Sequence, residues 1–414
     1  MLRKAALGDA SGARILSWVT NWRIVLLASV LLLVSAYIPR LHAAWSGGAG
    51  IFDSTGEPFG ADYVNIWTTA RMVLDGRVAE LFDAVGFHAA QEAMLGRPFQ
   101  DHNWSYPPHF LPLVLIFGLV PYLWGFVLWM GTTFGAYLAA VLPGRSQKAP
   151  LFLALLLAPS TYTNLAGGQN GFLTAALLLG ALRLLERHPV WAGMLFGLLT
   201  VKPQLGILVP VALLAAGAWR AIFSALVTTA LLVAASIALF GLEPWISYLR
   251  ETTRVQAGVL EYGTGLFTLM MPTPFMAARI MDWSIGIGYG LNAMIALGAA
   301  IVVGWAYRAK WGCTDLRAAI LLTATLLASP YAFNYDMTAL SAALLCIMAC
   351  LPNQAFRQGE LLAFIATWSL PMTVLSMNNA GIPLAPLVLA AMLAYLTLRA
   401  RDESRPTETI AQLV

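Results

Sequence analysis

The chain has few charged residues. Only 11% of its 414 residues are Asp, Glu, Lys or Arg, whereas 59% are hydrophobic, and the mean hydropathy is +0.73. Soluble domains carry about 25% charged residues and about 45–50% apolar ones. The composition therefore excludes a soluble enzyme, a disordered chain and a nucleic-acid-binding protein, and it predicts an all-α polytopic membrane protein. The pI near 9.0 is not evidence for a nucleic-acid partner.

Cysteine and the common cofactor motifs are also scarce. The three cysteines, Cys313, Cys346 and Cys350, have no histidine pair near them at zinc-ligand spacing. The sequence has no G-x-x-x-x-G-K-[ST] loop for nucleotide phosphates and no D-x-D motif. We therefore expect no cofactor and no metal site.

Long apolar runs are what the chain has in abundance. A helix needs about 20 mostly apolar residues to cross a bilayer. Residues 109–121 are too short for this, and we interpret them as a half-depth or re-entrant helix. We predict twelve spans, with thirteen as the alternative, at 22–39, 122–143, 150–163, 170–186, 190–202, 203–218, 219–241, 284–307, 316–330, 335–352, 359–378 and 383–400.

Basic residues predict the orientation of these spans. With the N-terminus in the cytoplasm, 16 of the 24 Lys and Arg residues fall on the cytoplasmic side, as the positive-inside rule requires. Both termini, 1–21 and 401–414, are then cytoplasmic tails of one membrane domain, 1–414. The two long segments, 40–108 and 242–283, face outward. We expect any chemistry on that outer face.

Three ionisable residues sit at the edges of apolar segments, where charge is costly and so marks functional candidates. Asp62 begins the expected helix 60–76, either as its N-cap or as a catalytic base. Lys202 lies between two apolar runs, and it either snorkels or binds a phosphate. Asp336 precedes another apolar run, as an N-cap or as a polar ligand.

Neutral polar residues accompany these three. Gln169 and Asn170 follow two glycines between spans, Gln204 is next to Lys202, and Tyr106 starts a stiff Tyr-Pro-Pro entry to 109–121. Amide and hydroxyl groups offer donors and acceptors that suit sugar hydroxyls. The glycine patterns Gly193-x-x-x-Gly197 and Gly286-x-x-x-Gly290 permit close helix contacts, which we expect within one monomer.

Taken in order, these elements resemble a known family. The chain carries Asp-Tyr at 62–63, LDG and LFD within 74–83, SYPP at 105–108, GGQN at 167–170, AGMLFGLLTVKPQ at 192–204 and SPYAFNYD at 329–336. Over about residues 20–400 this pattern resembles glycosyltransferase family 87 of the GT-C membrane superfamily. The chain departs from the family pattern at Phe333, Asn334 and Tyr335, where many members have His or Trp, so the acceptor stays open.

The resemblance implies a function and roles for residues. It implies transfer of a sugar, mannose above all, from a polyprenyl-phosphate donor to a lipid or glycan hydroxyl outside a bacterial cytoplasmic membrane, with inversion. Asp62 would be the base, and the donor phosphate would meet Lys202, with Arg71 or Arg254. Sugar and acceptor contacts are expected from Tyr63, Tyr106, Gln169, Asn170, Gln204, Asn334, Tyr335 and Asp336. The alternative is a transporter or flippase, which predicts inverted repeats and charges near the bilayer midplane.

Overall fold

The computed structural model describes residues 27–404, except 32, 33, 36, 37, 40, 41, 43–45, 47, 49, 55, 100, 101, 146, 351–355 and 358. Within these residues all named elements are helices, and the β-structure is one isolated bridge between Phe52 and Pro58. The predicted all-α class is therefore confirmed. The tail 1–21 and half of the predicted span 22–39 lie outside the described residues, as do 405–414.

The first outer segment and the apolar stretch 109–121 that follows it form short helices. They are α4 (Tyr63–Leu74), η2 (Val78–Phe82), α5 (Ala84–Leu95), η3 (Pro108–Phe110) and α6 (Leu111–Gly118). The second outer segment forms α14 (Glu243–Ser247), the π-helical turn η6 (Tyr248–Thr252), α15 (Thr253–Tyr262), α16 (Leu266–Leu269) and α17 (Pro274–Ile280). The two segments meet, because η2 packs against α14 and η6.

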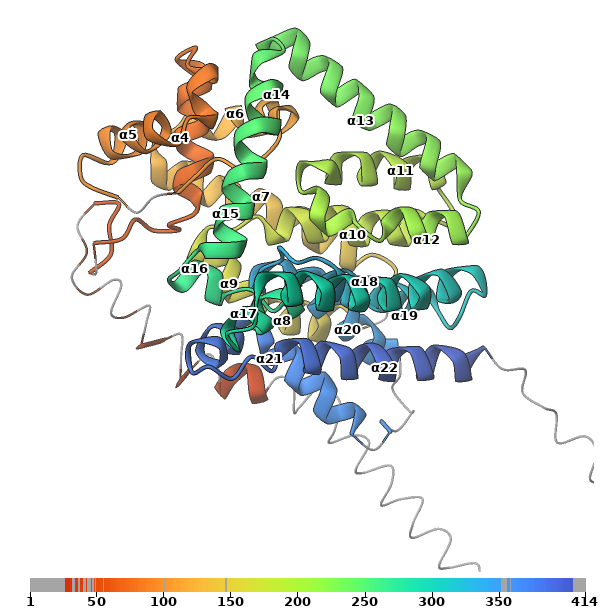
Figure 1. The fold of residues 1–414 in the computed structure, drawn as a ribbon. Helices are drawn as coiled ribbons and strands as arrows, with labels where there is room; N and C mark the ends of the chain where they lie inside the picture. Colours follow the sequence, from red (N-terminus) through yellow and green to blue (C-terminus); the bar gives the residue numbers. More distant parts are fainter. Residues whose placement is uncertain are drawn as a thin grey trace, which may run out of the picture.

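The remaining helices form the bundle. They are α7 (Tyr122–Val141), α8 (Lys148–Leu156), α9 (Pro159–Gly167), α10 (Gly171–Leu184), α11 (Pro189–Leu198), η4 (Leu199–Val201), η5 (Pro203–Gly206), α12 (Val209–Ala215), α13 (Trp219–Phe240), α18 (Ile285–Arg308), α19 (Thr314–Ala328), η7 (Asn334–Met337), α20 (Thr338–Cys350), α21 (Glu360–Asn379) and α22 (Ala385–Glu403). Figure 1 shows α10, α12, α18, α19 and α22 running alongside one another, with α13 slanting across to α14.

Helix α19 lies at the centre of the core. Every residue from Leu316 to Ala328 is buried, and α10, α18, α20 and α22 pack around this helix. A helix that is apolar all round is stable only when it is covered on every side. Helix α13 is the opposite case, because only 6% of its most apolar 18-residue stretch is buried within the protein. Its exposed apolar surface suits contact with lipid.

The predicted number of spans is not confirmed. Among the described residues, α7, α13, α18 and α21 are long and apolar enough to cross a membrane, and α8 with α9, bent by 48°, could make a fifth. The 14 residues of α10 extend about 21 Å, whereas the hydrocarbon core is about 30 Å thick. Twelve spans therefore stay a prediction. Residues 109–121, expected to form a half-depth helix, form α6 of 8 residues.

The first glycine pattern packs two helices together. A Cβ atom on Gly193 would lie 2.3 Å from the carbonyl oxygen of Ala221, and one on Gly197 would lie 2.6 Å from Cβ of Thr228. Helix α11 therefore approaches α13 closely, as expected for an internal contact. Gly286 and Gly290 have no heavy atom within 4 Å of such a Cβ, so the second pattern makes no comparable contact among the described residues.

This contact predicts a selective loss of stability. Gly193→Ala should destabilise the protein by about 1–3 kcal/mol, because the added methyl meets rigid backbone of α13. Thermal unfolding in detergent should show a lower Tm. Gly298→Ala, on α18 with nothing within 4 Å, is the matched control and should leave Tm unchanged or raise it. Equal Tm values for the two variants would contradict the close approach.

Candidate active site

Asp62 stands at the N-terminus of α4, but its side chain does not cap the helix. No hydrogen bond links the Asp62 carboxylate to the α4 backbone, so the capping interpretation is wrong. Instead the carboxylate accepts a hydrogen bond from the Gln169 side-chain amide, and one carboxylate oxygen lies 3.6 Å from Nδ1 of His102. The Asp62 side chain keeps 24% of its surface exposed. The carboxylate is thus oriented and still accessible.

Two glycines allow α4 and the segment 167–170 to meet. The backbone N–H of Asp62 donates to the carbonyl of Gly167 over 3.0 Å. Gly168 has φ +64°, and a Cβ atom there would lie 2.7 Å from Cβ of Tyr63 and 2.9 Å from the carbonyl oxygen of Gly60. Only glycine fits both the conformation and the contact. The GGQN motif therefore brings Gln169 to Asp62.

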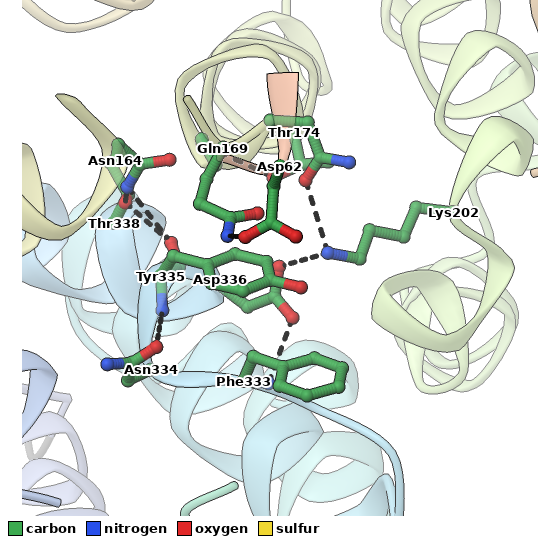
Figure 2. A network of polar contacts seen from close by, with 12 residues as sticks. Asp62, Asn164, Gln169, Thr174, Lys202, Phe333, Asn334, Tyr335, Asp336 and Thr338 are labelled. Atoms are coloured by element: carbon green, nitrogen blue, oxygen red, sulfur yellow. Dashed lines mark hydrogen bonds and ion pairs between the residues drawn. The ribbon is translucent and has the colours of Figure 1, made fainter. Parts of the chain in front are cut away.

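Lys202 is held in a buried polar network. Its ammonium donates to Asp336 over 2.6 Å and to the side-chain oxygen of Asn170 over 3.2 Å, and it lies 4.5 Å from the ring centroid of Tyr335. The side-chain amide of Asn170 donates to the Tyr106 hydroxyl over 2.5 Å. The Lys202 and Asp336 side chains are 3% and 0% exposed, so Lys202 does not snorkel to water. Figure 2 shows Lys202 reaching from a separate segment toward Asp336.

Asp336 also organises the loop that carries it. Its second carboxylate oxygen accepts from the backbone N–H of Phe333 over 3.0 Å, which closes the turn before η7. The rings of Phe333 and Tyr335 stack with centroids 5.2 Å apart. The side-chain amide of Asn164, on α9, donates to the carbonyl of Tyr335 over 3.3 Å. Asp336 therefore serves both as a turn-closing residue and as the partner of Lys202.

These groups surround one cavity. It encloses about 670 Å³ of empty space including its open mouth. Seven of the predicted site residues line this cavity: Asp62, Tyr106, Gln169, Asn170, Lys202, Gln204 and Tyr335. Its other lining residues are Asn65, Ile66, Asn103, Ser105, Gly168, Val201, Gln256, Phe267, Tyr331 and Phe333.

Five predicted site residues lie elsewhere. The Tyr63 ring is buried against Tyr122, with centroids 5.3 Å apart. Asn334 donates to the carbonyl of Pro371 over 2.8 Å, and Asp336 lies behind the cavity wall. Arg71 donates to the carbonyl of Gly118 over 3.3 Å and lines another surface hollow.

Helix geometry explains why the two arginines are absent from the cavity. Arg71 follows Asp62 by nine positions, which is two and a half turns, so it points to the opposite side of α4. Arg254 is exposed on α15, two positions before Gln256, which does line the cavity. Two positions amount to roughly 200° around a helix. Among the described residues that line the cavity, Lys202 is therefore the one lysine or arginine.

Sequence reasoning missed His102 and several neutral polar residues. His102 is not among the predicted site residues, yet its Nδ1 lies 3.6 Å from an Asp62 carboxylate oxygen. Its position three residues before Ser105-Tyr106 was the available signal, because Ser105 and Tyr106 both line the cavity. Asn65 lies one turn after Asp62 on α4, and Gln256 comes from the second outer segment. Only the folded chain brings Gln256 here.

Burial and neighbouring groups act on Asp62 in opposite directions. Burial raises the pKa of the Asp62 carboxyl above its usual 3.8, and His102, the Gln169 amide and Lys202 each lower this pKa in part. The net direction is upward. A carboxylate with a raised pKa is a stronger proton acceptor once it is deprotonated. The described residues contain no group of three His, Cys, Asp or Glu side chains positioned for a metal ion.

The buried ion pair generates a prediction of its own. Lys202→Met should destabilise the protein by about 3–5 kcal/mol, because it leaves the Asp336 carboxylate buried without its cation. The double variant Lys202→Met with Asp336→Leu should recover much of that loss. Thermal unfolding in detergent measures both. Arg77→Met, which breaks an exposed pair with Glu80, is the control and should cost no more than about 1 kcal/mol. A double variant no more stable than Lys202→Met would contradict the pairing.

Comparison with known proteins adds independent evidence. A family model described as glycosyltransferase family 87 matches residues 104–330, which is more than half of the chain. No curated protein and no solved structure matched. The matched range includes SYPP, GGQN and the Lys202 segment, whereas Asp62 precedes it and Asp336 follows it. The predicted resemblance is thereby confirmed, and the chain belongs to glycosyltransferase family 87.

Proposed function

We propose that this membrane glycosyltransferase transfers a sugar, mannose above all, from a polyprenyl-phosphate donor to a hydroxyl group of a lipid or glycan acceptor. The observation that carries the proposal is that the Asp62 carboxylate and the Lys202 ammonium line one cavity. Between and around them stand the neutral donors and acceptors of Tyr106, Gln169 and Asn170. Such groups match the hydroxyls of a sugar.

Asp62 is the base in this mechanism. The acceptor oxygen attacks the anomeric carbon, and its proton passes to the Asp62 carboxylate. The bond between the anomeric carbon and the phosphate oxygen breaks, and the polyprenyl phosphate leaves with the electron pair. This single displacement inverts the anomeric centre. The hydrogen bond from Gln169 orients the carboxylate, and positioned bases of this kind contribute about 10²–10⁴-fold to rate.

Lys202 stabilises the leaving phosphate. An ammonium group has three N–H donors, and two of them are directed at Asp336 and Asn170. In this proposal the third donates to a phosphate oxygen in the cavity that Lys202 lines. Because Asp336 holds the ammonium in place, the positive charge is preorganised where negative charge develops. No Arg71 or Arg254 contact is needed for this role.

An apolar groove supports a lipid-linked donor. It lies between α12 and α13 and encloses about 840 Å³ of empty space including its opening. Thr200 and Pro203, on either side of Lys202 in the sequence, both line it. Its other walls are apolar, including Phe196, Leu213 and Leu226. A prenyl chain in this groove would have its phosphate end close to Lys202.

The orientation and the assembly complete the proposal. The excess of basic residues in short loops favours both termini in the cytoplasm of a bacterial inner membrane, with the Asp62 cavity facing outward. The outer segments 40–108 and 242–283 both contribute lining residues, so the acceptor enters from the aqueous side. The chain acts as a monomer in this proposal.

The base assignment predicts a loss of turnover. Asp62→Asn should lower kcat by about 10²–10⁴-fold, because the amide cannot accept the acceptor proton. The assay uses purified enzyme with polyprenyl-phosphate mannose and a membrane lipid extract, with products identified by mass spectrometry. Asp75→Asn makes the same change at the exposed C-terminal end of α4, and it should retain activity. Near-normal turnover by Asp62→Asn would remove Asp62 from the mechanism.

The raised pKa of Asp62 predicts where kcat/KM falls on the acidic side of its pH profile, called the acidic limb below. A base works only when deprotonated, so kcat/KM should fall as pH drops through the Asp62 pKa, at a pH above 3.8. Gln169→Leu removes a hydrogen bond that favours the charged form, which raises this pKa further. The acidic limb of the variant should therefore move to higher pH. If kcat/KM of Gln169→Leu falls at the same pH as in the wild type, a group other than Asp62 controls the loss of activity at low pH.

A further inference from the structure

A second cavity lies at the opposite end of α10 from the Asp62 cavity. Asn170 precedes α10 and lines the first cavity, whereas Leu182, Leu185 and Glu186 at its other end line the second. The helix between them extends about 21 Å. The second cavity is the larger, with about 1510 Å³ of empty space including its open mouth. It is walled by the ends of α10, α12, α13, α18 and α19.

The charges at this cavity do not balance. Arg317 is buried, and its guanidinium donates to Glu186 over 2.6 Å and to the carbonyl of Gly312 over 2.6 Å. The ion pair of Arg317 with Glu186 therefore has no net charge. Arg220 and Lys310 are exposed at the cavity, and the structure records no ion-pair partner for either among the described residues. The cavity therefore has a net charge of about +2, counted from these four side chains.

The backbone at Lys310 is unusual. Its φ is +50°, and Asp282 is the other non-glycine residue with positive φ in the described chain. Lys310 follows the end of α18, where Trp311 N–H donates to the carbonyl of Ala306 over 2.9 Å. Glycine is the favoured residue at this left-handed position after a helix, because side chains are strained there. Lys310 is thus held in a left-handed conformation at the edge of the cavity.

The cavity also lies at the ends of two long apolar helices. Trp219 begins α13 and is 66% exposed, and α18 ends at Arg308. Both helices are long and apolar enough to cross a membrane. Tryptophan, arginine and lysine gather at helix ends because the ring and the charge meet the lipid headgroups there. Trp219 and Arg220 line the cavity from the first turn of α13.

We propose that this second cavity binds the phosphate headgroup of an anionic glycerophospholipid. The Arg220 guanidinium can hold two phosphate oxygens at once, and the Lys310 ammonium adds a point charge on the other side. Trp219 covers the glycerol region, and the acyl chains lie along the exposed face of α13. The lipid is a bound component separate from the transferred sugar, so the proposal does not rest on the transfer reaction.

Native mass spectrometry of the purified full chain tests the proposal. Phosphatidylglycerol is titrated, with phosphatidylcholine, a zwitterion of zero net charge, as the reference. The variant Arg220→Gln with Lys310→Gly should bind phosphatidylglycerol about 25-fold more weakly, at about fivefold for each cation removed. Binding of phosphatidylcholine should not change. Lys310→Gly also relieves the strained backbone at this position, so the Tm of the single variant Lys310→Gly should match or exceed that of the wild type.

Two further measurements test whether the cavity cations bind the lipid specifically and whether a lipid, rather than free phosphate, is the ligand. Arg308→Gln removes an exposed cation from the same end of the protein, outside the cavity lining, and it should retain phosphatidylglycerol binding. Inorganic phosphate at millimolar concentration should not displace the lipid. Equal binding by the double variant and the wild type, or an equal loss in Arg308→Gln, would overturn the site. Displacement by inorganic phosphate would overturn the lipid as its ligand.

Discussion

The ion pair between Lys202 and Asp336 is the contact on which the arrangement of the polar cavity depends. Both side chains are almost fully buried, so each would carry a large desolvation cost without the other. The pair joins the break between α11 and α12 to the loop before α20, and Asn170 connects it to the start of α10. Three segments far apart in the sequence are fixed around one ammonium group.

The segment that carries Lys202 lies between a polar cavity and an apolar groove. On one side of the Lys202 segment lies the polar cavity with Asp62, and on the other lies the apolar groove between α12 and α13. A charged residue at the boundary of polar and apolar space suits a ligand with a charged head and an apolar tail. The far end of α10 repeats the principle with Arg220 and Lys310, although there the cations keep no acidic partner among the described residues.

Much of the fold could be predicted from composition and periodicity, but helix boundaries could not. Apolar runs located α7, α13, α18 and α21, because long uninterrupted runs leave few other structures in a bilayer. The predicted span 150–163 instead divides into α8 and α9 at Pro159, and the spans 190–202 and 203–218 form shorter helices than predicted. Proline ends or bends a helix locally, and its effect on span number depends on how neighbouring helices cover the break.

The sequence by itself determined the membrane class, the family pattern and the ionisable residues that stand out in an apolar chain, Asp62, Lys202 and Asp336. The identity of these residues and the scarcity of charge around them can be determined from the sequence without knowledge of the fold. Only the tertiary structure decided their partners. It turned Asp62 away from capping toward Gln169 and His102, paired Lys202 with Asp336, and excluded Arg71 and Arg254 from the cavity. These outcomes depend on which side of a helix faces which neighbour, and that is set by packing between segments distant in the chain.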